Sequence, residues 1–132
     1  MDLADVLLIA DDPDLRETLR AILVDAGHKV VCAEGRQAGI DAFRRKRPDL
    51  VMIDIAMPEA EVVQSMRALR ANDPSVPMLA IAGGGRPLDR ASHLRMAKQL
   101  GATSIRSTRF RGGELSRLVG RVQGRGCADG EH

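Results

Sequence analysis

Short apolar runs alternate with longer amphipathic segments along almost the whole chain, and this alternation limits the fold more than any other feature. The runs are rich in Val, Ile and Leu, which favours β-strands, and they span residues 4–10, 28–33, 49–54, 76–82 and 102–107. The segments between them repeat apolar residues at helical spacing, which predicts helices near residues 13–26, 36–46, 59–71, 88–100 and 115–122. Five strand-helix units in succession predict an α/β fold, a doubly wound parallel sheet with right-handed crossovers and helices on both faces.

The segment after the first run carries the clearest helix pattern. Its apolar stripe has the spacing of one buried helix face and consists of Leu15, Leu19, Ile22, Leu23 and Ala26. Asp12 suits the N-cap, Pro13 suits the first helical position, and Gly27 suits the left-handed residue that ends a helix. The first helix is therefore expected to begin directly where the first strand ends.

The length and composition fit one compact domain. The chain has 132 residues, of which 44% are hydrophobic, and this is enough for a single core. We expect the domain to span residues 1–123, and residues 124–132, which have little apolar content, to form a disordered tail. No apolar run approaches the roughly 20 residues of a membrane span, and no secretion leader precedes the first strand. We therefore expect a cytoplasmic protein without membrane attachment.

The two cysteines have neither CxxC nor metal-ligand spacing. Cys32 lies within an apolar run and Cys127 within a glycine-rich tail, so a disulfide framework or a zinc site is not expected. We expect Cys32 to be a core thiol and Cys127 to be a loose one.

Acidic residues follow two of the predicted strands at the edge where open α/β sheets bind ligands. Asp11 and Asp12 come after the first run, and Asp54 ends the third. Two carboxylates about 5 Å apart repel each other by roughly 3 kcal/mol at an effective dielectric of about 20, so this edge should attract a proton or a divalent cation. Oxygen-only ligands favour magnesium. The simpler roles are a turn cap for Asp54 and a helix N-cap for Asp12, and the N-cap can coexist with metal binding.

Four motifs, at their separations, resemble the receiver domain of bacterial two-component response regulators. They are "VLLIADD" at residues 6–12, "VMIDIAMP" at 51–58, "VPMLAIAGGG" at 76–85 and "LGATSIRSTRF" at 100–110. The resemblance covers essentially the whole chain. It implies a flavodoxin-like (βα)5 fold whose five parallel strands have the order 2-1-3-4-5.

The resemblance also implies the roles of the acidic residues. Asp54 would be the phosphoacceptor, to which a histidine kinase or a phosphotransfer protein passes its phosphoryl group. Asp12, Asp54 and the backbone carbonyl of Ala56 would coordinate magnesium, and Asp11 would assist through water. The chain would then be a signalling module that acts by protein contact, and not an enzyme.

Three positions depart from the receiver pattern. Ala82 stands where receivers carry a Ser or Thr whose hydroxyl bonds the phosphoryl oxygen, and Thr108 stands where they carry a lysine that pairs with it. Ile105 replaces the switch aromatic. A phosphorylated state should therefore be poorly stabilised, although Arg106 or Arg109 could act as a substitute cation.

These departures leave two interpretations of the function open. The first is a single-domain receiver that is phosphorylated at Asp54, and the second is a degenerate pseudo-receiver that binds a partner independently of phosphorylation. An FMN protein of the same fold is disfavoured because "DDPD" at residues 11–14 would repel a phosphate. A phosphatase with an early aspartate nucleophile is disfavoured because the threonine expected after a second acid and the cap region are missing.

Charge is distributed unevenly along the chain, although the net charge is only +2. Residues 86–125 hold ten Lys or Arg against two acids, whereas residues 1–59 hold twelve acids against eight bases. The basic residues of the last two predicted helices could be only solvated surface or could form a face for an acidic downstream protein. They are Arg90, Arg95, Lys98, Arg117 and Arg121, with Arg106 beside them. Nucleic acid is not expected, because two Phe and no Tyr or Trp leave little to stack on bases, and we expect a monomer or a weak homodimer.

Overall fold

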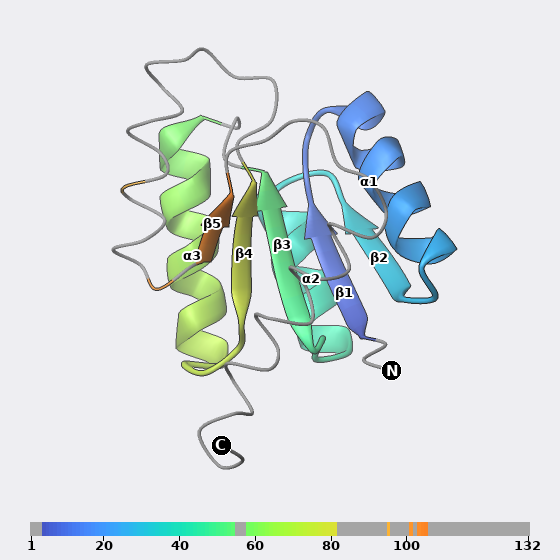
Figure 1. Cartoon of the computed structure of the whole chain (residues 1–132). Coiled ribbons are helices and arrows are strands. Elements are labelled where there is room, and N and C mark those ends of the chain that lie inside the picture. The colour runs from blue at the N-terminus through green and yellow to red at the C-terminus, as the bar shows by residue number, and fades with distance from the viewer. Residues whose placement is uncertain (1–3, 55–57, 82–94, 96–100, 102, 106–132) are drawn as a thin grey trace.

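The computed structural model describes residues 4–54, 58–81, 95, 101 and 103–105 (Figure 1). Strands and helices alternate through most of this part of the chain. They are β1 (Asp5–Ile9), α1 (Pro13–Asp25), β2 (Lys29–Ala33), α2 (Arg36–Arg45), β3 (Leu50–Asp54), α3 (Glu59–Asn72), β4 (Met78–Ile81) and β5 (Thr103–Ile105). The first three predicted helices are confirmed within a few residues, and the two predicted near residues 88–100 and 115–122 lie outside the described residues, apart from Arg95, which is helical.

The strands form one sheet in the order β2-β1-β3-β4-β5. All four strand pairs are parallel, with Ile9 aligned with Ile53 between β1 and β3, and Asp54 aligned with Ile81 between β3 and β4. The predicted α/β fold and its strand order 2-1-3-4-5 are therefore confirmed. Because the order reverses at β1, the carboxyl ends of β1 and β3 meet at the topological switch point of the sheet.

Helices cover both faces of the sheet, as the alternation predicts (Figure 1). On one face, side chains of α2 and α3 such as Phe43 and Met66 pack with Leu7 and Val51. On the other face, Leu19 and Leu23 of α1 pack with the strand residues that alternate with these, such as Leu8 and Met52. The central strand β3 is buried along its whole length, which explains its continuous apolar sequence.

The start of α1 has the predicted cap. The side chain of Asp12 accepts a hydrogen bond from the backbone N–H of Asp14 at 3.0 Å, and Pro13 opens the helix. After the helix, Gly27 has φ 100°, a conformation that glycine adopts without strain. These local signals fix the short connection between the end of β1 and α1.

One edge-strand residue differs in position from the prediction. Cys32 was expected in the core, and it is exposed. It lies on β2, an edge strand of the sheet, aligned with Leu8 of β1, and an edge strand has no second neighbour to cover it. The apolar sequence around Cys32 therefore indicated a strand correctly but did not indicate burial.

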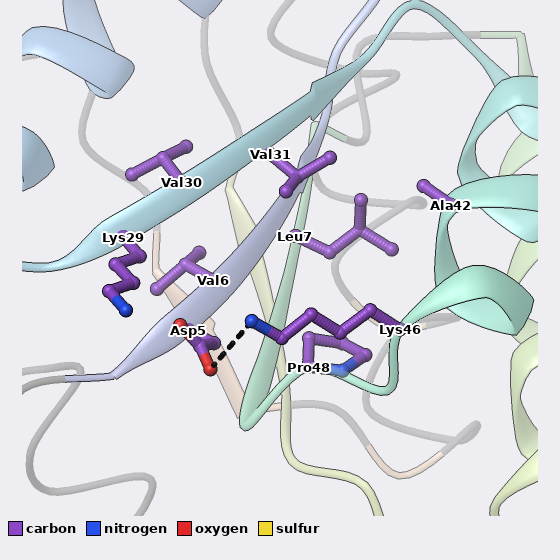
Figure 2. Close-up of a pocket in the computed structure, with 9 residues that line it drawn as sticks. All are labelled: Asp5, Val6, Leu7, Lys29, Val30, Val31, Ala42, Lys46 and Pro48. Atoms are coloured by element: carbon purple, nitrogen blue, oxygen red, sulfur yellow. Dashed lines mark ion pairs between the residues drawn. The ribbon is translucent and has the colours of Figure 1, made fainter.

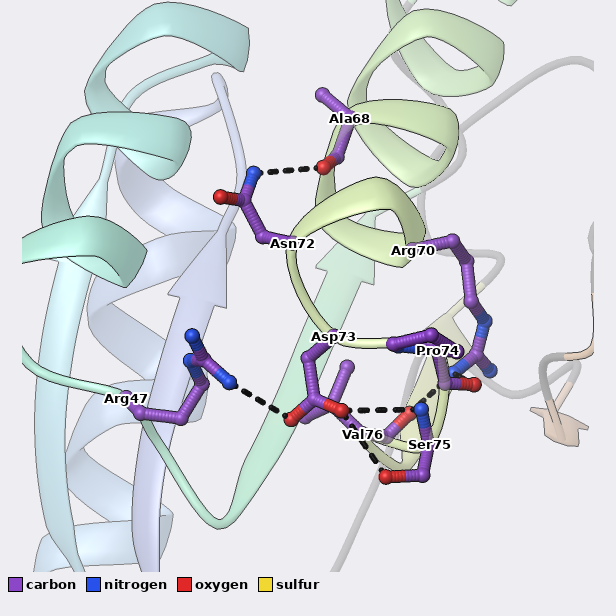
Figure 3. A network of polar contacts seen from close by, with 8 residues as sticks. All are labelled: Arg47, Ala68, Arg70, Asn72, Asp73, Pro74, Ser75 and Val76. Atoms are coloured by element: carbon purple, nitrogen blue, oxygen red, sulfur yellow. Dashed lines mark hydrogen bonds and ion pairs between the residues drawn. The ribbon is translucent and has the colours of Figure 1, made fainter.

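Polar contacts join the loops that lead into the central strands (Figure 3). Arg47, in the connection before β3, lies 3.2 Å from a carboxylate oxygen of Asp73, in the connection before β4. Asp73 also accepts hydrogen bonds from the backbone N–H and the hydroxyl of Ser75, both at 3.0 Å. These contacts hold the amino ends of β3 and β4, opposite the edge where the acidic residues lie.

Arg70 extends this network to β5. Its guanidinium donates to the carbonyl oxygens of Pro74 at 3.0 Å, Val76 at 2.7 Å and Gly101 at 3.0 Å. Gly101 has φ 90° and lies two residues before β5. One side chain at the end of α3 therefore ties together the segments that enter β4 and β5.

Candidate functional site

Asp54 ends the most deeply buried strand of the sheet. Its residue surface is only 1% exposed, although carboxylates are rarely buried in proteins. The three residues before it are fully buried, and Asp54 itself is aligned with Ile81 of β4. The packing of β3 therefore holds this carboxylate at a fixed place at the carboxyl edge.

Asp11 and Asp12 reach the same edge from the neighbouring strand. The β1–β3 register aligns Ile9 with Ile53, so the residue after Ile9 lies level with Asp54 and the two aspartates follow it. Both are exposed. One oxygen of Asp12 serves as the helix cap, as predicted, which leaves its second oxygen to face another group.

The donor chemistry of this edge fits magnesium, but the three carboxylates do not form a compact cluster. Within the described part of the chain, no three His, Cys, Asp or Glu side chains are grouped so as to hold a metal ion. Mg²⁺ usually takes only one or two carboxylates and keeps several waters, so Asp12 and Asp54 could supply its protein ligands. Magnesium at this edge stays a prediction.

A cation that the sequence analysis missed also lies at this edge. The Arg16 guanidinium donates to the carbonyl oxygen of Ala10 at 2.8 Å, and the backbone N–H of Arg16 bonds to the Asp12 carbonyl at 2.9 Å. Arg16 thereby joins the first turn of α1 to the residue that follows β1. Its position one turn after the N-cap was the available signal, because residues four apart share a helix face.

Most of the other predicted site positions lie outside the described residues. They are Ala56, Ala82, Arg90, Lys98, Arg106, Thr108, Arg109, Arg117 and Arg121. Arg95 is helical and exposed. Ile105 ends β5, and its backbone is aligned with Ile81 of β4, which places it one strand further from Asp54.

A family model for the response regulator receiver domain matches residues 6–110. The chain belongs to this family. Receiver domains are signalling modules of two-component systems, and they interact with histidine kinases or phosphotransfer proteins. The predicted family membership is therefore confirmed, and the buried Asp54 lies at the end of β3 within the matched region.

Similar proteins include short and long chains. An uncharacterized 14.6 kDa protein of Leptolyngbya boryana is 34% identical over 94 residues, which are 69% of this chain and 71% of that protein. Transcriptional regulatory protein AfsQ1 of Streptomyces coelicolor is 30% identical over 84 residues, 64% of this chain but only 37% of AfsQ1. The similarity to AfsQ1 therefore concerns about a third of that protein.

The solved structures support the fold. Chemotaxis protein CheY4 of Vibrio cholerae matches with a TM-score of 0.76 and 24% identity, over 92% of this chain and 99% of CheY4. At this identity the likeness concerns the fold alone.

Among the helices that the structure describes, none is long and apolar enough to cross a membrane.

Proposed function

We propose that this receiver domain accepts a phosphoryl group on Asp54 from a histidine kinase or a phosphotransfer protein and signals by protein contact. The observation that carries the proposal is the burial of Asp54, 1% exposed, at the carboxyl end of the central strand. A buried carboxylate costs free energy, and a site for phosphoryl transfer gives a reason to keep it there. The proposed signalling unit is residues 1–123, with residues 124–132 as a tail.

The transfer needs a nucleophile that is held in place. A carboxylate oxygen of Asp54 attacks the phosphorus of a phosphohistidine, and the new O–P bond forms as the N–P bond breaks. The electron pair of the broken bond stays on the imidazole nitrogen, which takes up a proton, and Asp54 becomes an acyl phosphate. Strand β3 supplies the positioning, because its residues are packed on both faces.

Magnesium would be held by Asp12, Asp54 and the carbonyl of Ala56, with Asp11 acting through water. Bound there, the metal would offset the charge that gathers on the phosphoryl oxygens. The capping bond from Asp14 fixes the Asp12 side chain, and Arg16 fixes the backbone of Ala10 beside it. These contacts orient the acidic edge before any ligand arrives.

The departures at Ala82, Ile105 and Thr108 weaken the switch that phosphorylation would operate. A phosphoryl group shifts a conformational equilibrium only by its differential affinity for the two states. Without the hydroxyl and the ammonium, that difference is small unless Arg106 or Arg109 substitutes for the lysine. We therefore expect phosphorylation to change the conformation of this domain less than in a receiver with the full set.

The first experiment tests transfer itself. Incubation with acetyl phosphate and magnesium should add one phosphoryl group to the wild type, as measured by intact mass, and chelation of magnesium should prevent it. Asp54→Asn should abolish the addition, whereas Asp25→Asn, which removes an exposed carboxylate at the end of α1, should leave it unchanged. Failure to phosphorylate the wild type, from acetyl phosphate and from a phosphorylated histidine donor, would overturn the proposal.

A degenerate pseudo-receiver is the second candidate, and the residues Ala82 and Thr108 favour it. In that case a downstream protein would bind the basic face formed by Arg90, Arg95, Lys98, Arg117 and Arg121 regardless of Asp54. Reversal of Arg95 and Arg117 to Glu should slow association at low salt under either candidate. Only the pseudo-receiver predicts equal partner binding by the wild type and Asp54→Asn under phosphorylating conditions.

Restoring the missing hydroxyl and ammonium groups tests whether their absence weakens the switch. Ala82→Thr combined with Thr108→Lys should increase capture of beryllofluoride, a phosphoryl mimic, at Asp54. The two substitutions should be non-additive because they hold the same group. Large amide shifts at Ile105 in the wild type with beryllofluoride would contradict a weakened switch.

A further inference from the structure

Strand β2 lies at one edge of the sheet and offers an apolar edge. It pairs with β1 alone, so one side of its backbone has no strand partner within the described sheet. Val31 is 53% exposed and Cys32 is exposed as well. Natural edge strands are commonly protected by charges, prolines or bulges, but Lys29 is the only charged residue in β2 and the strand has no proline.

A hollow lies beside this edge, between the end of α2 and the first residues of β1 and β2 (Figure 2). Its volume is about 170 Å³, slightly more than an engineered cavity of about 150 Å³ that binds benzene. Leu7, Val31, Ala42 and Pro48 contribute apolar lining. The hollow is therefore large enough for one apolar side chain.

Lysines outnumber carboxylates in the lining of the hollow. Lys29 and Lys46 line it together with a single carboxylate, that of Asp5. Lys46 Nζ lies 3.7 Å from Asp5 Oδ2, and the lysine side chain is 69% exposed, so this pair contributes little and can exchange partners. Arg45 is also exposed, and it lies three residues after Ala42, on the adjacent part of the helix surface.

We propose that this edge of the domain, comprising β2 and the hollow, binds an extended acidic segment of a partner protein. The segment pairs its backbone with the outer side of β2, inserts one apolar side chain into the hollow and places carboxylates near Lys29 and Lys46. In strand addition, backbone hydrogen bonds give affinity and pockets for alternate side chains give specificity. A second copy of this chain fits less well, because two such edges would bring their cations together.

The alternation of side chains along β2 suggests a peptide that can test the proposal. Residues i and i+2 of a strand share a face, and Lys29 and Val31 of β2 lie on the face that α2 covers. A blocked heptapeptide, Thr-Asp-Thr-Leu-Thr-Asp-Thr, places one Leu and two Asp on one face and Thr, a good strand former, on the other. It should bind the full chain with a dissociation constant below about 1 mM and shift the amide signals of Leu7, Val30 and Val31.

Backbone pairing has its own readout. The β2 amides that do not bond to β1 should exchange more slowly with solvent when the peptide is bound, which simple electrostatic adsorption would not cause. Lys46→Glu should weaken binding about five-fold, whereas Arg67→Glu, an exposed cation on α3, should change it less than two-fold.

Three results would overturn this proposal. The first is the absence of amide shifts at millimolar peptide. The second is equal binding of peptides with Gly in place of Leu or Asn in place of Asp. The third is equal protection of β2 by self-association of the chain without peptide, which would assign the edge to a second copy. If the peptide binds, Val31→Ser should lose binding, which would show that the peptide lies on β2. Val31 is exposed, so this substitution should not disturb the fold.

Discussion

Val31 and Val51 lie in the same row of the sheet, but one is exposed and the other is buried. Both are aligned with Leu7 of β1, one from β2 and the other from β3, so all three lie in one row across the sheet. Val51 is fully buried, whereas Val31 is 53% exposed. The order of the strands therefore decides which of the two valines is buried, since they have the same residue type and lie in the same row.

The two strands support different tasks. Strand β3 has a strand on each side and helices on both faces, so its last residue, Asp54, is presented by a rigid support. Strand β2 has one neighbour, and its outer edge keeps hydrogen-bonding groups and apolar surface that a partner can use. A reaction that needs a fixed nucleophile suits the first strand, and recognition of an extended segment suits the second.

The matched pair Val51→Ala and Val31→Ala tests this comparison with the largest expected effect. Val51→Ala should lower the free energy of unfolding by about 2 to 3 kcal/mol, because it removes two buried methyl groups and leaves a cavity. Val31→Ala should change it by less than about 0.5 kcal/mol. Urea denaturation of the three proteins measures both values. Equal losses would mean that β2 is covered in solution.

A second prediction concerns His28, which directly precedes β2 and connects it to the residue before β1. Its Nδ1 accepts a hydrogen bond from the backbone N–H of Ala4 at 3.0 Å, and the residue is only 6% exposed. His28→Leu leaves this N–H without its acceptor and should cost about 1 to 2 kcal/mol of unfolding free energy. The sequence analysis did not identify this contact, because it joins residues 24 positions apart.

His28→Asn is the control for that prediction. The amide oxygen of Asn can take the place of Nδ1 as the acceptor, so part of the lost stability should return. Amide exchange at Ala4 gives a local readout, which should be faster in His28→Leu than in His28→Asn. If the two variants are equally stable and Ala4 exchanges equally fast in both, this bond does not anchor β2.

The sequence predicted the fold well because the pattern and the local signals agree. The alternation of strands and helices predicts the parallel sheet, and the Asp12–Pro13 cap and Gly27 define α1 as the structure has it. Burial at the edge was harder to predict. The run around Cys32 looks like a core strand, but whether such a run is central or peripheral depends on strand order, which the residues of one strand do not contain.

The candidate site was predicted in part. The expectation that strand ends converge brings Asp11, Asp12 and Asp54 to one edge, and the structure places them there. Arg16 and the hollow beside β2 were missed. An arginine on a helix face has several open partners in a sequence, and a hollow depends on how closely a helix such as α2 approaches the sheet.

Asp73, in the connection before β4, is the site of the prediction with the smallest expected effect on stability. The backbone N–H of Ser75, and then the Ser75 hydroxyl and Arg47, hold the pKa of Asp73 below its usual value. A lowered pKa in the folded state means that the unfolded chain binds the proton more readily. The stabilisation is therefore present above the ordinary aspartate pKa of about 3.9 and is lost as the pH falls through the folded-state pKa.

Asp73→Asn should accordingly lower the free energy of unfolding by about 0.5 to 1 kcal/mol at pH 7, because the contacts are partly exposed to solvent. The difference from the wild type should shrink as the pH is lowered below about 4. Urea denaturation between pH 7 and pH 3 measures this, with Asp25→Asn as the control for loss of one surface carboxylate. A difference that stays constant down to pH 3 would show that Asp73 does not act through its charge. The loss of stability in Asp73→Asn would then come from its hydrogen bonds with Ser75, and not from the charge that faces Arg47.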